Sequence, residues 1–184
     1  MIGCNLPLTR RVLGNAWFSL PPSLRAMHDV HSELTAEGIA TVERGSGLLA
    51  QLVAGFMRFP AAGEGIPLRV EFRVKNGKEI WRRTFAEKSF VSIQEAGTGR
   101  FDHLLCERFG PIKVGLALVV DNKRLRLVVR GWSLFGIPLP AFSAPSGDTY
   151  EFEEEGRFNF HAEIAHPVTG LIVRYHGWLK PRAN

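Results

Sequence analysis

Apolar and charged residues alternate with a period of two near the middle of the chain. Between residues 68 and 75, every second residue is Leu, Val or Phe, and the residues between them are Arg, Glu or Lys. This alternation predicts a strand with one buried and one exposed face. Asn76-Gly77 follows directly, and this pair is the strongest short signal for a hairpin turn. We therefore expect residues 78–86 to pair antiparallel with residues 68–75.

The same pattern continues toward the C-terminus, with short apolar segments separated by Gly, Pro, Asn and Asp. The further predicted strands are 89–95, 101–109, 112–121, 124–133, 149–155, 157–165 and 170–179. Residues 136–147 lack periodicity and are expected to form a loop. A meander of this length twists strongly and tends to curl or close. The expected fold is mainly β (α+β), a strongly curved antiparallel sheet or partly closed β-barrel of about 8–10 strands with two helices, in one domain spanning residues 1–184.

Two segments before residue 60 have helical spacing instead. Leu24, Met27 and Leu34 follow Pro21-Pro22-Ser23 and predict a helix over 22–34, with a short strand at 39–43 after it. A second helix is predicted over 46–58. Its broad apolar face predicts that it is largely buried against the sheet, where it plugs the sheet or covers one opening. The members of that face are Leu48, Leu49, Leu52, Val53, Phe56 and Met57. The first twenty residues have no clear assignment.

Composition narrows the class of protein. Apolar residues make up 45% and charged residues 22% of 184 residues, as in ordinary globular domains. The net charge of +5 is spread along the chain rather than gathered in a stripe, which argues against a nucleic-acid partner. No apolar run reaches the ~18 residues of a membrane span, and no signal peptide is recognisable. We therefore expect no membrane partner. Cys4 and Cys106 do not indicate a disulfide framework, so we also expect a cytoplasmic protein.

Motifs for cofactor, metal and nucleophile chemistry are weak or missing. Gly45–Ala50 matches a loose G-x-G-x-x-A pattern, but antiparallel strands follow it rather than a βαβ unit. The histidines form no recognised ligand set, and H-E-x-x-H is absent. There is no G-x-S-x-G, and Cys106 lies in an apolar strand, as expected of a buried structural thiol. We expect no cofactor and no metal.

Arginine and aromatic residues recur on single strand faces. Trp81, Arg83 and Phe85 share one face of a predicted strand, and His161 and Glu163 share one face of another. If these faces are convex, they form solvated ladders or stacked Arg–aromatic pairs. If they are concave, they line a ligand pocket in which Arg83 and Arg130 hold an anionic group. The candidate ligand-binding residues are Trp81, Arg83, Arg130, Trp132, His161, Tyr175 and Trp178.

Alternation sets one limit on this set, because Tyr175 and Trp178 lie on opposite faces and at most one lines the pocket. The first functional hypothesis is non-catalytic binding of a small amphipathic or anionic molecule in the concave face. A rival is an enzyme in which His161 or His28 acts with Glu163 as an acid–base pair. A third is an accessory module that docks on an oxidoreductase through an exposed apolar patch around residues 136–147.

Seven segments together resemble one bacterial family, catalogued as domain of unknown function 4166. They are Leu20–Arg25 with His28, Gly38–Gly47, Trp81–Phe85, Glu107–Pro111, Phe135–Pro140, Gly156–Phe160 and Gly170–Leu179. In that family the domain stands alone or follows an oxidoreductase-like or epimerase-like nucleotide-binding domain. The resemblance therefore implies a β-rich domain and an oxidoreductase-like partner protein. The family has no assigned activity, so no catalytic residues carry over.

Overall fold

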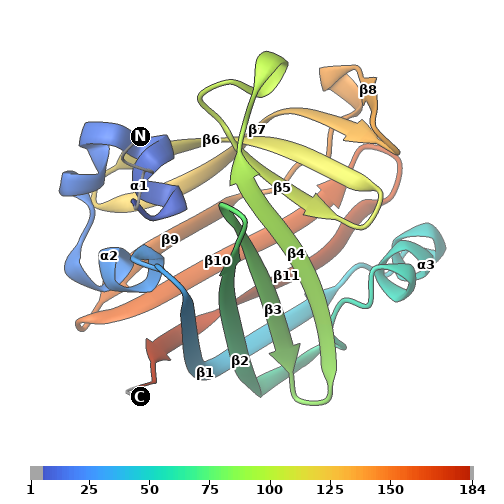
Figure 1. Cartoon of the computed structure of the whole chain (residues 1–184). Helices are drawn as coiled ribbons and strands as arrows, with labels where there is room; N and C mark the ends of the chain where they lie inside the picture. The colour runs from blue at the N-terminus through green and yellow to red at the C-terminus, as the bar shows by residue number, and fades with distance from the viewer. Residues whose placement is uncertain (1–5, 183–184) are drawn as a thin grey trace.

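The alternating segments form ten antiparallel strands that close into one barrel, in a computed structural model that describes residues 6–182. The barrel strands are β1 (Glu33–Arg44), β2 (Gly63–Lys75), β3 (Lys78–Phe85), β4 (Lys88–Ala96), β5 (Leu105–Phe109), β6 (Ile112–Asp121), β7 (Arg124–Leu134), β9 (Thr149–Glu154), β10 (Arg157–His166) and β11 (Gly170–Pro181). Pairing of β6 with β7 closes the ring (Figure 1). The short strand β8 (Ile137–Leu139) pairs with β7 outside the ring. The predicted β fold is confirmed.

Local hairpin signals are confirmed, whereas two irregular segments differ from the prediction. Lys75 pairs with Lys78 across the Asn76-Gly77 turn, as expected. The predicted strand 101–109 begins only at Leu105, because η2 (Gly99–Phe101) precedes it. The ring of Phe101 occupies the space left by the missing side chain of Gly115, which explains this turn. Residues 136–147 are not only loop, since they contain β8 and η3 (Ala141–Ser143).

Residues 8–28 form a helical cap on one end of the barrel (Figure 1). It consists of α1 (Leu8–Leu13), η1 (Gly14–Ser19) and α2 (Pro22–His28). The predicted helix 22–34 is wrong beyond His28. The predicted strand 39–43 is too short, because β1 already starts at Glu33 and pairs along its length with both β2 and β11. The hydrogen bonds to both neighbouring strands stabilise the extended conformation of this segment more than the spacing of its apolar residues favours a helix.

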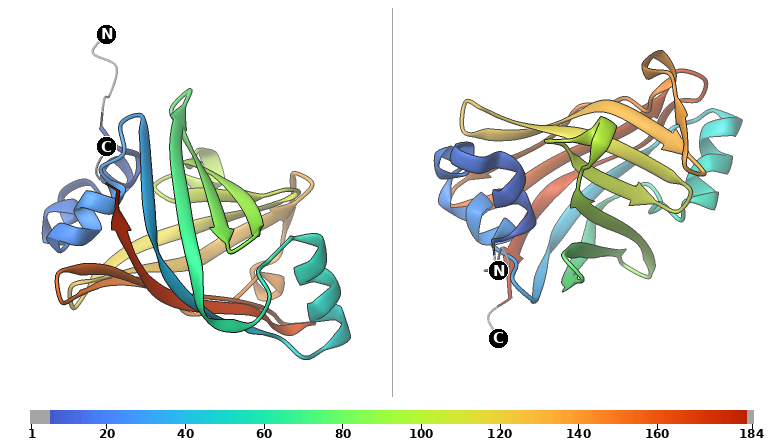
Figure 2. Two further views of the ribbon diagram at one scale, coloured as in Figure 1. Left: turned by 90° about the horizontal axis from the view of Figure 1, so that it is seen from below. Right: turned by 45° about the horizontal axis from the view of Figure 1, so that its top comes forward.

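The second predicted helix exists as α3 (Leu48–Phe56), but its predicted burial is wrong. Only Ala50 and Ala54 are buried in it, and the large apolar side chains of Leu48, Leu52 and Phe56 are exposed. α3 packs near β11 at the end of the barrel opposite the N-terminal cap, as the right view of Figure 2 shows. Small alanine side chains allow the helix to approach the barrel closely, which turns its larger residues outward.

The barrel interior holds most of the apolar core. One cluster of buried residues extends from α2 across β1–β4, β10 and β11 and includes Leu125 of β7, and a smaller one joins Leu8 to β5, β6 and β7. Cys106 is a buried free thiol, as expected, and burial raises its pKa. Cys4 lies outside the described residues. Among residues 6–182, no helix is both long and apolar enough to cross a membrane.

Candidate functional site

The barrel encloses a cavity of about 540 Å³. Inward-facing Leu, Val, Ile and Phe side chains from seven of the ten barrel strands line it. At one end the lining includes Thr9 and His28 of the N-terminal cap. At the other end it includes Leu49 of α3 and Val168 of the β10–β11 turn, together with residues 145–147. The cavity is therefore capped at one end and reaches the surface beside α3, which we call the open end.

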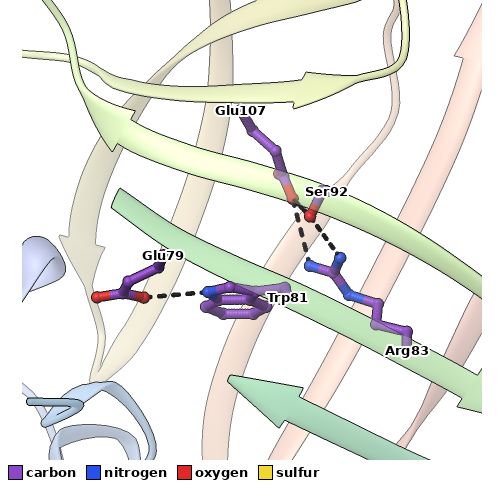
Figure 3. A network of polar contacts seen from close by, with 5 residues as sticks. All are labelled: Glu79, Trp81, Arg83, Ser92 and Glu107. Atoms are coloured by element: carbon purple, nitrogen blue, oxygen red, sulfur yellow. Dashed lines mark hydrogen bonds and ion pairs between the residues drawn. The ribbon is translucent and has the colours of Figure 1, made fainter. Parts of the chain in front are cut away.

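Polar side chains are concentrated on the wall formed by β3, β4 and β5. The Arg83 guanidinium donates a hydrogen bond of 2.8 Å to Ser92 Oγ and one of 3.3 Å to Glu107 Oε1 (Figure 3). Ser92 Oγ donates to the same Glu107 oxygen at 2.7 Å. The guanidinium also lies 4.8 Å from the ring centroid of Trp81. The charge of Arg83 is thus matched by a buried carboxylate and covered by an aromatic ring.

Gln94 lies on the same wall with an unused acceptor. It stands between Glu79 and Glu107 in the cross-strand register and lines the cavity. The residue is only 2% exposed, and its Oε1 has no hydrogen-bond partner among residues 6–182. A buried amide oxygen without a partner is costly to stability.

A buried histidine–carboxylate pair lies at the capped end of the cavity. His28 Nε2 is 2.6 Å from Glu151 Oε2, and its Nδ1 is 3.2 Å from the hydroxyl oxygen of Thr9. Burial disfavours the charged imidazole, but the Glu151 carboxylate outweighs it and raises the pKa of His28. The pair joins α2 and α1 to β9 and borders the cavity.

Two further carboxylates attach the cap to the barrel. Glu79 accepts hydrogen bonds from the Trp81 indole at 3.0 Å and from the backbone N–H of Leu8 at 3.3 Å (Figure 3 shows the indole bond). Burial raises the pKa of Glu79, although these donors oppose the shift. Glu153 accepts a hydrogen bond from the backbone N–H of Ser23 at 2.8 Å. The cap is therefore held by specific polar contacts as well as by apolar packing.

Four of the seven residues predicted to bind ligand lie inside the barrel, and three do not. Trp81, Arg83, Trp132 and Tyr175 line the cavity. Tyr175 is buried among aromatic rings, and this burial raises the pKa of its hydroxyl. The Trp132 indole donates a hydrogen bond of 3.1 Å to the Pro140 carbonyl, which ties β7 to the segment after β8.

Arg130, His161 and Trp178 point to the outside. The His161 residue is part of the cavity wall, but its ring stacks between Tyr150, at 5.0 Å, and the exposed His176, at 6.2 Å. The pKa of His161 is lowered, mainly because its ring is partly desolvated and secondly because His176 lies beside it. Trp178 lies under the Arg157 guanidinium at 5.4 Å.

Glu163 belongs to the same outer face. It accepts a hydrogen bond of 2.8 Å from Arg174, which also bonds Glu43. The polar residues of β10 and β11 therefore form a ladder on the convex side.

Sequence reasoning missed the polar residues that complete the inner wall and the cap: Thr9, Glu79, Ser92, Gln94, Glu107 and Glu151. A signal for several of them was present. Glu79 has the same strand parity as Trp81 and Phe85, and Glu107 stands between Leu105 and Phe109. A carboxylate in phase with the core residues of a strand points inward, where it requires a partner.

The fold and cavity define a class of protein, namely a closed antiparallel β-barrel around an apolar cavity with a few buried polar groups. The chain belongs to the family described as Domain of unknown function (DUF4166), whose model matches residues 20–179. This range contains all ten barrel strands except the last two residues of β11. No curated protein and no solved structure matches the chain.

Proposed function

We propose that this protein binds a small amphipathic molecule inside its barrel. The observation that carries the proposal is the cavity of about 540 Å³, which falls within the range of ligand-binding pockets. Most of its lining is apolar and suits a hydrocarbon part of the ligand. The polar wall of β3–β5 would receive the ligand's polar end, and Trp81, Trp132 and Tyr175 would pack its apolar part.

The polar wall favours a ligand that donates hydrogen bonds. Arg83 is already paired with Glu107, so an anionic group would compete with that carboxylate. Gln94 Oε1, in contrast, is a buried acceptor without a partner among the described residues. A hydroxyl or amide N–H on the ligand would satisfy this oxygen. Of the amphipathic and anionic classes, these contacts favour an uncharged amphipathic molecule.

Native mass spectrometry of the purified protein, beside a denatured control, tests the proposal. We expect extra mass that disappears on denaturation. A matched pair of variants on β6 locates the binding: Leu118 lines the cavity, whereas its neighbour Val119 faces outward. Leu118→Trp should reduce the fraction of protein that retains the extra mass about tenfold by obstructing the cavity, and Val119→Trp should leave that fraction unchanged. Equal retention in both variants, or an apo mass that amphipathic alcohols and amides do not alter, would refute binding in the barrel.

The His28–Glu151 pair supports a second candidate function, acid–base catalysis on the bound molecule. The two side chains border the cavity, and His28 Nε2 lies 2.6 Å from Glu151 Oε2. Burial lowers the pKa of the imidazole, but the Glu151 carboxylate raises it by more, so the pKa of His28 is raised. Glu151 takes the role expected of Glu163, which is bound to Arg174 on the outer face. The compound retained by wild type and by His28→Gln would be compared by mass. Catalysis predicts that the variant holds a different compound, the unconverted substrate, and identical compounds argue for binding alone.

Two further proposals concern the setting of the protein. A cytoplasmic location is supported by the buried free thiol of Cys106, and an oxidoreductase-like partner is supported by the family resemblance. Such a partner would supply or consume the bound molecule. Affinity purification of the tagged protein from its native cells, with the Leu118→Trp variant as control, tests whether an oxidoreductase is recovered. Its absence in both samples would contradict the partner proposal.

A further inference from the structure

Large apolar side chains are exposed mainly at the open end of the barrel. Thirteen such side chains are exposed among residues 6–182, and eight of them belong to α3, to residues 135–142 or to the β10–β11 turn. These eight are Leu48, Leu49, Leu52, Phe56, Phe135, Ile137, Phe142 and Val168. Figure 1 shows α3 and β8 on the same side of the barrel, away from the N-terminal cap. We call this surface the apolar rim.

The orientation of α3 is the reverse of that expected for a helix on a water-exposed surface. Ala50 and Ala54 face the barrel, whereas Leu48, Leu52 and Phe56 are 80%, 69% and 75% exposed. These three residues are spaced four apart and therefore follow one face of the helix. A helix on a globular protein normally turns its large apolar residues inward. The exposed face of α3 thus matches a helix that lies in the interface of a bilayer.

The distribution of charge at the rim also fits a lipid surface. Residues 45–63, 135–147 and 166–170 contain Arg58 and His166 as their only ionisable side chains, although 22% of the whole chain is charged. These segments contain no carboxylate, so nothing in them would repel an anionic headgroup. Few charged groups would have to be desolvated when the segments insert. The net charge of +5 attracts the whole chain toward an anionic membrane surface.

The rim is continuous with the cavity. Leu49 and Val168 are exposed on the rim and also line the cavity, and Val53 of α3 lines it beside them. A partner protein on this surface would cover the open end, whereas the hydrocarbon layer of a bilayer would connect directly with the cavity. An amphipathic molecule could then pass between the two without crossing water.

We propose that the apolar rim docks on an anionic phospholipid bilayer, with α3 and residues 135–142 inserted at the interface. The expectation of no membrane partner relied on the absence of an apolar run long enough to span a bilayer, and a helix that lies at the interface needs no such run. Docking would place the open end of the cavity against the source or destination of its ligand. The docking surface consists of residues outside the polar wall, so it can be tested separately from ligand binding.

Vesicle flotation tests the docking. The vesicles contain phosphatidylcholine with about one-third phosphatidylglycerol, at low and at physiological salt. We expect wild type to float with them, and Leu52→Glu/Phe56→Glu to lose about tenfold or more in partitioning. Phe18→Glu is the matched control, because Phe18 is exposed on the cap at the opposite end. It should float like wild type, and thermal unfolding should show that both variants remain folded.

Three results would overturn the proposal. The first is wild type that stays with the unbound fraction at both salt concentrations. The second is equal flotation of the α3 variant and the Phe18→Glu control. The third is a wild-type dimer in light scattering that does not float and becomes monomeric in the α3 variant, which would assign the rim to a second copy of the chain. Native mass spectrometry of the α3 variant separates the two proposals, because the retained ligand should persist when docking is lost.

Discussion

Buried carboxylates with defined partners determine much of the local chemistry in this barrel. Glu107 pairs with Arg83 and Ser92 on the cavity wall, and Glu151 pairs with His28 beneath the cap. Removing one partner from such a buried pair leaves the other without compensation, which is more costly than losing an exposed ion pair. The effects of single substitutions should therefore depend strongly on which partner remains.

The His28–Glu151 pair makes stability depend on pH. The pKa of His28 is raised in the folded protein, because Glu151 outweighs burial, above an unfolded value near 6.5. The folded state therefore holds this proton more tightly. The resulting stability is fully present below pH 6.5 and is lost as pH rises through the raised pKa. Glu79 is the other carboxyl that acts on His28, and burial raises its pKa in the folded protein. Its contribution to stability is therefore also lost as the pH rises through that raised pKa.

Urea unfolding as a function of pH measures this effect. Glu151→Gln should destabilise the protein by about 3 kcal/mol near pH 6, and the loss of stability above pH 6.5 should largely disappear. His31→Gln is the matched control, because His31 is an exposed histidine that pairs with Asp29 on the surface. It should retain the wild-type pH profile. A profile in Glu151→Gln that parallels wild type would show that the pair does not control the titration.

Gln94 should reduce stability in the protein without ligand. Replacing it by leucine removes the unpartnered Oε1 from the apolar cavity wall. We expect Gln94→Leu to stabilise the ligand-free protein by about 1 kcal/mol and to weaken retention of the ligand. Gln51→Leu on exposed α3 should change stability by less than about 0.5 kcal/mol. Lower stability of ligand-free Gln94→Leu would mean that the amide is satisfied in another way.

At the scale of elements, the contact between β1 and β11 depends on two glycines. A Cβ at Gly38 would lie 1.9 Å from the Trp178 carbonyl oxygen, and one at Gly177 would lie 2.1 Å from the Ile39 oxygen. Both obstacles are backbone atoms, so a side chain could enter only if the two strands separated. The hydrogen bonds of this ladder are part of the closed ring and would be disturbed with it.

Gly177→Ala should therefore destabilise the barrel by about 2 kcal/mol or more. Gly55→Ala in α3 is a suitable control, because nothing lies within 4 Å of the new Cβ. Alanine has a higher helix propensity than glycine, so Gly55→Ala should be neutral or should stabilise the protein by up to about 1 kcal/mol. Thermal unfolding of the three proteins gives the comparison. Equal midpoints would show that the two strands can separate at little cost.

At the scale of the whole molecule, occupancy of the cavity should contribute to stability. A ligand that binds only the folded barrel stabilises it by about 2.7 kcal/mol at one hundred times its dissociation constant. Stripping the purified protein on a hydrophobic resin should lower its unfolding midpoint, and adding back the eluted material should restore it. Leu118→Trp, with its cavity obstructed, should show a smaller change after the same treatment. A wild-type midpoint that does not respond would argue against an occupied cavity.

Local sequence determined the barrel strands to within a few residues wherever alternation was regular. Residues 68–75, the Asn76-Gly77 turn and residues 78–86 illustrate this, because side-chain period and turn chemistry are properties of neighbouring residues. Residues 22–34 show the limit. Leu34 fits the helical spacing, yet it belongs to β1, whose two neighbouring strands are distant in sequence.

Only the tertiary structure decided which face of each strand is concave. Alternation places His161 and Phe160 on opposite faces of β10, but it does not say which face lines the cavity of a closed barrel. Closure of all ten strands decided that His161 points outward and that the inward-facing Glu107 of β5 meets Arg83 of β3. The same limit applies to α3, since an apolar helix face indicates contact with something apolar without saying what. Its exposure depends on where a closed barrel leaves its open end, which no single segment specifies.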